Sequence, residues 1–507
     1  MRPLPAKMMR LQQKAQKFAV LQQVRGQSIP IPAPTEGMNT RDGVSSLKPT
    51  ECRSLRNMLA ERGKCVIRKG KTSHQTVSGV SSIGMMFTHE GVSANVILAA
   101  AGGEIYNVTG TPSALTSNSY NSDVWSVVQF NDTTVGVNGQ DTPWAFDGST
   151  VGASGLSGSG LTITNLRTVH VAGVRMWFTE VNSADVWYLA PNAVTGTLTK
   201  FQLSQETKGG YCVGVYEYGT YTIFIMSTGE ITTYQGDPGT DFSQAKTYQS
   251  PRPVGYDPGI DVNGEPVIMT ASGPLPFEAI ARGLDDNAVD QGPWGKIAPS
   301  WAQDFESYGS NAGWNAEFFM GLVILNIQID STTSKQWVFN TRNKSWSFFD
   351  DLDGFQFTES GGVLYFGDKG SGEIFTNTGG TDDSASIVGT IRGGFIYPFQ
   401  SQVNGQYTLA RLNVEATGTV TGQIQVDTDY RELGINAPEI PLASSGSGPW
   451  GEPWGSPWGQ NGQPILKWSS VKGFGRSVAP VVQFNSQADD LAYYGIDLIA
   501  AQCGVTG

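Results

Sequence analysis

The residues best able to do chemistry in this chain of 507 residues are few and widely spaced. Three carboxylates, Asp350, Asp351 and Asp353, precede Gly354 and offer oxygen ligands of the kind that calcium prefers. An acidic surface turn explains the same residues more simply. Histidine chemistry would rest on three residues, His74, His89 and His170. Because His170 stands within an apolar run, we predict that it is a core residue.

Cysteines and the common catalytic motifs add nothing to this set. The four cysteines are scattered without a CxxC pair: Cys52, Cys65, Cys212 and Cys503. We expect buried or reduced thiols there, not a zinc site or a disulfide framework. The chain has no P-loop, GxSxG, HExxH or strand-bounded GxGxxG motif. A glycosidase would need two carboxylates at a set separation, which no sequence can show. We therefore predict that the chain is not an enzyme and holds no cofactor and no metal.

The elements that would position such residues are mostly short strands. Between Gly91 and Gly379, runs of β-branched and aromatic residues recur, each closed by a Gly, Asn or Asp turn. The clearest units span residues 96–108, 127–148, 171–189, 215–234, 322–340 and 361–377, with a degenerate unit at 266–277. A spacing of roughly 30 to 50 residues favours radial repetition. We predict an irregular β-propeller of six or seven blades over residues 76–380; a stacked pair of sheets is the alternative.

The N-terminal residues 1–30 predict a basic amphipathic arm. A cationic stripe is formed by residues three or four positions apart: Lys7, Arg10, Lys14 and Lys17. An apolar stripe lies beside it: Met8, Leu11, Ala15 and Phe18. Such a helical arm either docks on an acidic partner or nucleic acid, or is a solvated tail.

Residues 31–75 predict an extended strap that lies across the propeller. Prolines keep the chain extended as it leaves the arm: Pro30, Pro32 and Pro34. Pro49 is suited to open a helix of one or two turns that runs through Leu55. A strand from Cys65 to Arg68 then leads into the first blade.

Residues 381–507 predict a small β-sandwich, which follows a linker at residues 376–386. One half-buried strand is marked by apolar residues that alternate with polar ones: Ala410, Leu412, Val414 and Ala416. Further strands are expected at residues 420–426, 477–485 and 491–499. Three Pro-Trp-Gly repeats at a period of four carry Trp450, Trp454 and Trp458 on a loop. This loop either contacts another subunit, a sugar or a membrane, or folds back on its own domain.

Charge is divided unevenly along the chain. Residues 1–71 hold fifteen Lys and Arg against four acids, a net charge of +11; since the whole chain carries −12, the other residues carry −23. A basic leader on an acidic body suggests two different neighbours. No apolar run approaches the roughly 18 residues that a membrane helix needs, so we predict no membrane span. The first residues lack the apolar core of a secretory signal, so we expect the chain to stay in the cytoplasm where it is made.

The strap carries the most specific pattern of the sequence. Five short patterns follow one another along it: Gly-x-Asn-x-x-Asp, Leu-x-Pro-x-Glu, Leu-x-Asn, Gly and Arg-x-Gly. Their residues are Gly37, Asn39, Asp42, Leu47, Pro49, Glu51, Leu55, Asn57, Gly63, Arg68 and Gly70. This order, placed before an irregular propeller, resembles the tail hub or nozzle family of short-tailed bacteriophages, also called packaged-DNA stabilisation proteins. The motif is one of turn and packing residues, not of chemistry.

The resemblance implies a structural protein of the virion tail. In that family six copies form a homo-oligomeric ring beneath the head-to-tail adaptor, continue the channel for double-stranded DNA and close its distal end until infection. The ring also carries the tail needle, spike or fibre proteins. An acidic body fits a channel through which DNA slides, because each Lys or Arg contact to phosphate adds affinity.

Two other interpretations stay open at this point. One is a tail propeller that binds a receptor or a glycan, or that degrades a glycan. The other is a stand-alone quinoprotein-like or scaffold propeller that needs no other virion protein. The first predicts binding or cleavage of host polysaccharide, and the second predicts a monomer.

Overall fold

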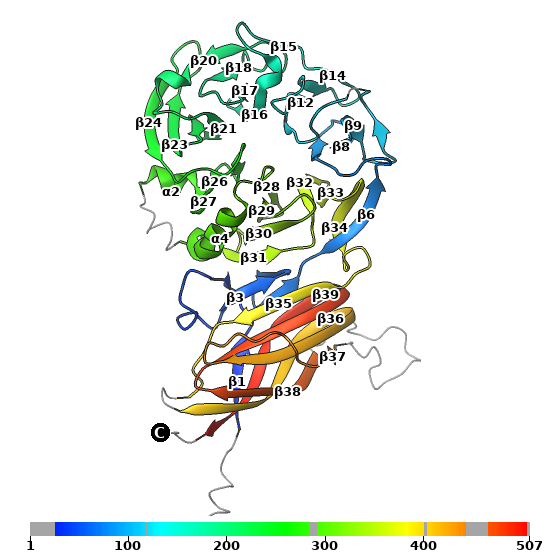
Figure 1. Cartoon of the computed structure of the whole chain (residues 1–507), viewed down its shortest axis with the longest axis vertical. Helices are drawn as coiled ribbons and strands as arrows, with labels where there is room; N and C mark the ends of the chain where they lie inside the picture. Colours follow the sequence, from blue (N-terminus) through cyan, green and yellow to red (C-terminus); the bar gives the residue numbers. More distant parts are fainter. Residues whose placement is uncertain (1–25, 118, 284–291, 400–402, 443–464, 504–507) are drawn as a thin grey trace, which may run out of the picture.

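The computed structural model describes residues 26–117, 119–283, 292–399, 403–442 and 465–503. A ring of antiparallel sheets occupies one end of the molecule, and a folded sheet of long strands occupies the other (Figure 1). The prediction of an all-β chain with a propeller is confirmed. Within the described ranges, no helix is both long enough and apolar enough to span a bilayer.

Seven successive groups of antiparallel strands form the ring in the described part of the chain. The first two groups are β7 (Met85–His89), β8 (Val96–Ala101), β9 (Glu104–Asn107) and β10 (Ser113–Ala114), then β11 (Ser126–Phe130), β12 (Thr133–Val137), β13 (Trp144–Phe146) and β14 (Val151–Ala153). The next two are β16 (Leu166–Ala172), β17 (Arg175–Glu180), β18 (Val186–Tyr188) and β20 (Thr199–Phe201), then β21 (Cys212–Tyr218), β22 (Tyr221–Met226), β23 (Glu230–Gln235) and β24 (Ser243–Gln249).

The last three groups complete the circle. The fifth contains β25 (Gly259–Asp261), β26 (Pro266–Thr270) and β27 (Gly273–Pro276), and is followed by the helices α2 (Phe277–Ala281), η3 (Trp294–Ile297) and α4 (Ala298–Tyr308). The sixth contains β28 (Asn315–Phe319), β29 (Leu322–Gln328), β30 (Ser334–Asn340) and β31 (Ser345–Phe349). The seventh contains β32 (Gly354–Ser360), β33 (Val363–Asp368) and β34 (Glu373–Gly379).

Local sequence explains why these segments form hairpins. Gly102 and Gly103, at φ +60° and +81°, make the two-residue turn between β8 and β9, where only a residue without a Cβ adopts this conformation at low cost. Both faces of the strands are largely buried, because neighbouring sheets of the ring pack against each other. The ring is closed where β32 meets β7, and there Thr358 Oγ1 donates to Thr88 Oγ1 at 3.0 Å.

The start of the chain completes the seventh sheet. Strand β6 (Gly70–Thr76) lies antiparallel to β34, with Thr76 opposite Glu373 and Lys71 opposite Asn377. The outer strand of this sheet therefore comes from the strap, and its other three strands come from residues more than 270 positions later. Ring closure thus ties the two ends of the propeller together by backbone hydrogen bonds.

A second strand of the strap joins the ring to the folded sheet. Strand β3 (Glu51–Arg56) lies between β31 and β35 (Ile387–Gly393), so one sheet runs from the sixth group into the other domain. The prediction of a helix from Pro49 through Leu55 is therefore wrong. Pairing with strands on both sides overrides the local preference of a Pro-led segment. Pro49 instead occupies the second position of a turn in which the Glu51 N–H donates to the Lys48 carbonyl at 2.9 Å.

The folded sheet is built around two very long strands, β36 (Asn404–Thr428) and β39 (Val478–Cys503), which pair along their whole lengths. Strands 410–416 and 420–426 were predicted as separate but are one strand, and so are 477–485 and 491–499. Register shifts lie between Thr417 and Thr419, where the sheet folds over. The two halves face each other, since a Cβ on Gly473 would lie 2.6 Å from Val426 Cγ2.

The rest of this domain flanks the two long strands. Its other strands are β37 (Ile440–Pro441), β38 (Ile465–Gly475), β1 (Gln27–Pro32), β5 (Lys64–Ile67) and, beside β5, β4 (Met58–Glu61). Strand β1 pairs with the end of β39, with Gln27 opposite Ala500. The strap of residues 31–75 thus does not simply lie across the propeller, because its strands are built into the sheets of both domains. The alternating residues predicted as half buried, Ala410 to Ala416, do point into the core.

Truncation at two positions tests how far the fold depends on the strap. A chain that begins at residue 77 lacks β1, β3, β5 and β6, so we expect it to aggregate and to lose cooperative thermal unfolding. A chain that begins at residue 26 keeps every described strand and serves as the matched control. Circular dichroism melts and size-exclusion chromatography measure both. A cooperative melt of the shorter chain would contradict the role given to the strap strands.

Candidate functional site

The residues of the strap motif meet at the junction between the ring and the folded sheet (Figure 1). The junction is defined here as β3, the turns on either side of it, and the segments of residues 345–350 and 381–393 that pack on it. Of the motif residues, Asn39, Glu51, Asn57 and Arg68 are buried. Polar residues that are scattered over the strap are therefore buried at this junction, in two clusters.

Asn57 sits at the centre of the junction and is fully buried. Its φ of +53° is a conformation that Asn tolerates better than most residues. Its Nδ2 donates to Asp350 Oδ1 at 2.6 Å and to the Val388 carbonyl at 3.1 Å, and its Oδ1 accepts from the Asp350 N–H at 3.0 Å. The side chain thus bonds to the ring through Asp350 and to the folded sheet through Val388.

Arg68 completes this network and has 1% of its surface exposed. Nε donates to Asn57 Oδ1 at 2.9 Å, and the two terminal nitrogens hold Asp382 in a fork at 2.9 and 2.6 Å. The remaining N–H groups donate to the carbonyls of Lys69 and Asp350 at 3.0 and 2.9 Å. All five donors of the guanidinium are therefore used, which a buried arginine requires.

A second polar cluster fixes the first part of the strap. Asn39 Nδ2 donates to Asp42 at 2.8 Å and to Glu51 at 3.2 Å. Glu51 is buried and pairs at 2.9 Å with Lys296 Nζ, which comes from η3. Hydrogen bonds from the Arg41 and Asn39 side chains hold the pKa of Asp42 below its usual range. The cluster thus attaches the strap to the helical connection that follows the fifth sheet.

Two glycines of the motif allow close approach of the backbone. A Cβ on Gly37, whose φ is +74°, would lie 2.7 Å from Ser345 Cβ. A Cβ on Gly70 would lie 2.1 Å from the Thr381 carbonyl oxygen. Neither position has room for a side chain, so the interpretation of this motif as turn and packing residues agrees with their contacts.

Sequence reasoning missed the partners of the motif. Asp382 was assigned to a linker, and Lys296 was not singled out. Arg53 was also missed: it donates to Asp427 at 3.0 Å and lies over the Phe395 ring at 4.7 Å. Asp382, Lys296 and the Asp427 partner of Arg53 are hundreds of positions from the strap, and nothing local marks them.

The acidic run that was considered for calcium serves the junction instead. Asp350 accepts from Arg56 Nε at 2.5 Å and from Asn57, while Asp353 accepts from the Ser334 N–H at 2.8 Å. Burial, and then the neighbouring Asp350, raise the pKa of Asp351. Among the described residues, no three metal-ligating side chains gather in one place.

His170 and three of the four cysteines are buried. His170 accepts or donates a hydrogen bond with Thr168 Oγ1 at 2.9 Å, and burial lowers its pKa. Three of the cysteines are buried, and all four are free thiols: Cys52, Cys65, Cys212 and Cys503. Two other predicted groups, the arm with Lys7, Arg10, Lys14, Lys17, Met8, Leu11 and Phe18, and the loop with Trp450, Trp454 and Trp458, lie outside the described residues.

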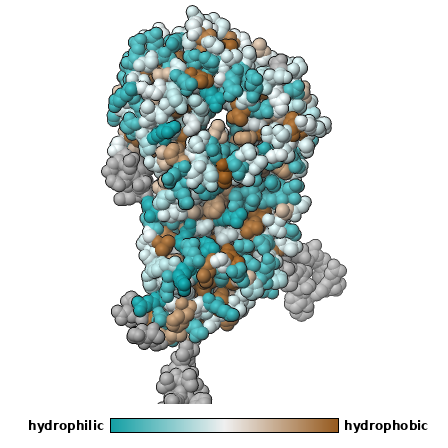
Figure 2. All heavy atoms as spheres, in the orientation of Figure 1, coloured by the Kyte–Doolittle hydropathy of each residue, from teal (hydrophilic) through white to brown (hydrophobic). Residues whose placement is uncertain are grey.

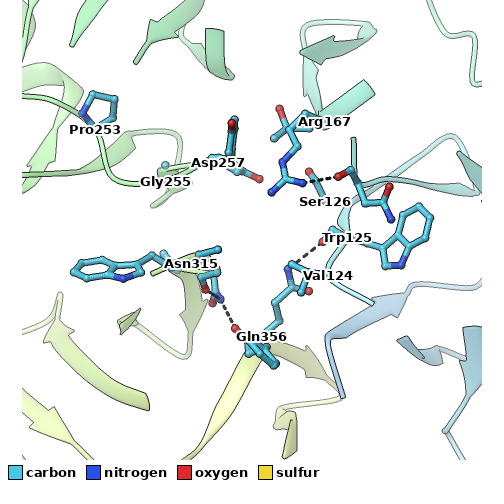
Figure 3. Close-up of a pocket in the computed structure, with 18 of the residues that line it drawn as sticks. Val124, Trp125, Ser126, Arg167, Pro253, Gly255, Asp257, Asn315 and Gln356 are labelled. Carbon is cyan, nitrogen blue, oxygen red and sulfur yellow. Dashed lines mark hydrogen bonds between the residues drawn. The ribbon is translucent and has the colours of Figure 1, made fainter. Parts of the chain in front are cut away.

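A cavity of about 580 Å³ occupies the centre of the ring (Figure 3). Innermost strands and their flanking loops from around the ring line it, so its residues are far apart in the sequence. Arg167, Asp257, Asn315, Gln356 and the backbone near Trp125 surround the open space. Sequence reasoning did not find this group, because no motif spans seven sheets.

The charges around the cavity are unusual. Arg167 lies over the Tyr256 ring at 4.5 Å and donates to the Asn138 carbonyl, and burial lowers its pKa. Glu317 lines the same space, and burial, followed by the charge of Glu359, raises its pKa to about 8. Glu317 is therefore largely protonated near pH 7, while Arg167 keeps its charge.

From the contacts of Arg68 at the junction we predict a large loss of stability when this residue is replaced. Arg68→Met leaves Asp382 buried without its partner, so we expect a loss of about 3–5 kcal/mol in the free energy of unfolding. Lys48→Ala removes an exposed pair with Glu36 in the same strap, and should cost less than about 1 kcal/mol. Urea unfolding measures both, and equal costs would contradict the role of Arg68.

The cavity predicts a pH dependence of stability. Between about pH 4.5 and pH 8 the folded chain keeps the proton of Glu317 while the unfolded chain loses it, so stability falls as pH rises. Relative to Glu317→Gln, the wild type should lose on the order of 2 kcal/mol between about pH 5 and pH 8.5, a value discounted for partial exposure. Urea unfolding at both pH values measures the difference, with Glu90→Gln as an exposed control. If the difference in unfolding free energy between the wild type and Glu317→Gln is the same at both pH values, the raised pKa of Glu317 is contradicted.

The chain is similar to known proteins in its fold only. No protein-family model and no curated protein matches the chain. Among solved structures, the computationally designed Ika8 protein is 8% identical, with a TM-score of 0.36 over 60% of this chain and 98% of that one. The WD40 β-propeller domain of Doa1 is 9% identical, with a TM-score of 0.37 over 61% of this chain and 96% of that one. Both similarities are too weak to indicate what this chain does.

Proposed function

We propose that this chain is a structural subunit of a bacteriophage tail, a nozzle or hub protein. In this proposal it is a seven-bladed propeller with a C-terminal β-sandwich, and about six copies form a ring below the head-to-tail adaptor. The ring continues the DNA channel, closes it, and carries needle, spike or fibre proteins. The observation that carries the proposal is the junction, where four polar residues of the family-like motif are buried: Asn39, Glu51, Asn57 and Arg68.

The junction suits a part that must keep its shape within an assembly. A continuous sheet through β3, the buried Arg68–Asp382 pair and the Glu51–Lys296 pair couple the two domains rigidly. A closed ring of identical subunits uses one heterologous interface repeatedly, so a small change in the angle between domains would prevent closure. Fixing that angle inside the subunit therefore supports assembly.

The distribution of charge also supports this function. The body of the chain is strongly acidic, so a lumen formed between copies would offer phosphates few cations to bind. The cavity inside each propeller is lined by side chains, so the duplex would pass between subunits and not through them. In this proposal the basic arm and the tryptophan loop contact neighbouring proteins of the tail.

The oligomeric state of the full chain tests the proposal. Native mass spectrometry should find a closed ring, with six copies expected from the resemblance, alone or after mixing with the other tail proteins. Negative-stain images should show a central lumen in line with the DNA channel of the particle. A chain that stays monomeric in the presence of those proteins would refute the proposal.

The arm provides a second test. Reversing its cationic stripe to Glu, at Lys7, Arg10, Lys14 and Lys17, should weaken incorporation into particles at least tenfold, because an acidic neighbour would then repel it. The matched control reverses four exposed cations outside the arm: Arg62, Lys246, Lys344 and Lys472. Quantitative blotting of purified particles gives the result, and equal incorporation of both variants would remove the docking role of the arm.

One observation favours the second candidate function, a tail propeller that binds a receptor or a glycan. The central cavity has a size suited to a small ligand and a polar lining. This candidate rests on the cavity alone and is compatible with assembly into a ring.

A further inference from the structure

The central cavity contains cations without acidic partners. Arg167 and Arg252 both line it, and among the described residues neither forms an ion pair. The guanidinium of Arg167 has one hydrogen bond, to the Asn138 carbonyl, and stacks on Tyr256. A largely buried cation that keeps several free donors is costly unless an anion or ordered water satisfies them.

The acids of the cavity do not neutralise these arginines. Asp257 accepts from the Tyr216 hydroxyl at 2.6 Å and lies 3.9 Å from His170 Nδ1. Glu317 carries a raised pKa of about 8 and so holds its proton at neutral pH. Two arginines stand against the one carboxylate of Asp257, so the lining carries a small positive charge inside a protein whose net charge is −12. This contrast favours an anionic ligand.

The amides of the cavity are oriented to accept hydrogen bonds. Asn315 Nδ2 donates to the Gly313 carbonyl at 2.8 Å and to the Phe355 carbonyl, and Gln356 Nε2 donates to the Trp125 carbonyl at 3.1 Å. The backbone uses both N–H groups of Asn315 and one of the two N–H groups of Gln356 (Figure 3). Asn315 can therefore offer only its oxygen to a ligand, while Gln356 can offer its oxygen and one N–H. Together with Asp257 they form a set of acceptors, which requires a ligand rich in hydroxyl or N–H donors.

An aromatic surface lies beside this polar group. The rings of Tyr211 and Tyr256 stack at 5.6 Å, and both residues line the cavity. Sugar rings present C–H groups on one face and hydroxyls around their edge, so an aromatic wall next to acceptors is suited to a sugar. A cavity of about 580 Å³ lies within the usual range for small-ligand sites.

We infer that the central cavity binds an acidic sugar, a uronic or sialic acid unit, with its carboxylate on Arg167 and its hydroxyls on the oxygens of Asn315, Gln356 and Asp257. The guanidinium fork matches a planar carboxylate in a way that a neutral sugar cannot use. A phosphate group would use the arginines but would leave the acceptors unpaired, or place them against negative charge. This inference rests on the second candidate function, whose ligand it names, and it holds whether or not copies form a ring.

Saturation-transfer NMR and calorimetry with the full chain test the inference. Glucuronate and N-acetylneuraminate should be titrated against glucose and inorganic phosphate as separate arms. We expect at least one acidic sugar to bind at least tenfold more tightly than glucose and more tightly than phosphate. Equal binding of glucose, tighter binding of phosphate, or no binding of either acid would overturn the inference. None of these outcomes depends on the oligomeric state.

Variants locate the site. Arg167→Lys keeps the charge but loses the fork and the planar stack on Tyr256, so affinity for the acidic sugar should fall at least tenfold. Arg252→Gln changes an exposed residue at the cavity and is expected to fold normally, with a fall of about threefold. Arg342→Gln changes an exposed arginine outside the cavity and should leave binding unchanged. Unchanged affinity in both cavity variants would place the sugar elsewhere and overturn the assignment.

Discussion

The buried guanidinium of Arg68 is the interaction on which the rest of the structure depends. Its partners come from three places: Asn57 in the strap, Asp350 after the sixth sheet and Asp382 after the seventh. If one of them is absent, a charge or a donor stays buried without a partner, at a cost that water cannot offset. All the hydrogen-bond partners of Arg68 are in place only when the ring is closed and β3 is paired. Closure of the ring and attachment of the second domain therefore depend on each other.

The same condition makes the fold depend on contacts between distant parts of the chain. Strand β1 pairs with the end of β39, and β6 pairs with β34, so the strap belongs to sheets whose other strands come last in the sequence. Contacts of such long sequence separation form slowly, because the chain loses the entropy of closing a long loop before the new contacts can compensate for it. The hairpins of the ring are local, and we expect them to form before the strap is inserted.

The contrast between local hairpins and long-range pairing of the strap explains what could be predicted from the sequence. The hairpins of the ring were predictable because each one is encoded by its own turn, such as Gly102 and Gly103, and by its own apolar strands. The strand β3 was mistaken for a helix because β31 and β35, the strands on either side of it, are more than 290 residues away. The motif residues Asn57 and Arg68 were found by their order, but their partners were not. Arg167 and the cavity were missed, since residues from separate sheets meet there only after folding.

The pairing of β1 with β39 has a mechanical consequence for the arm that precedes it. The two strands are antiparallel, and Gln27 lies opposite Ala500, so the arm leaves the sheet at the end where β39 finishes. A pull on the arm along the strand axis therefore strains the hydrogen bonds of β1 in shear, all at the same time. Peeling, in contrast, would break them one by one. A chain anchored in this way resists a pull along the strand axis more strongly than a chain that can be peeled from the sheet.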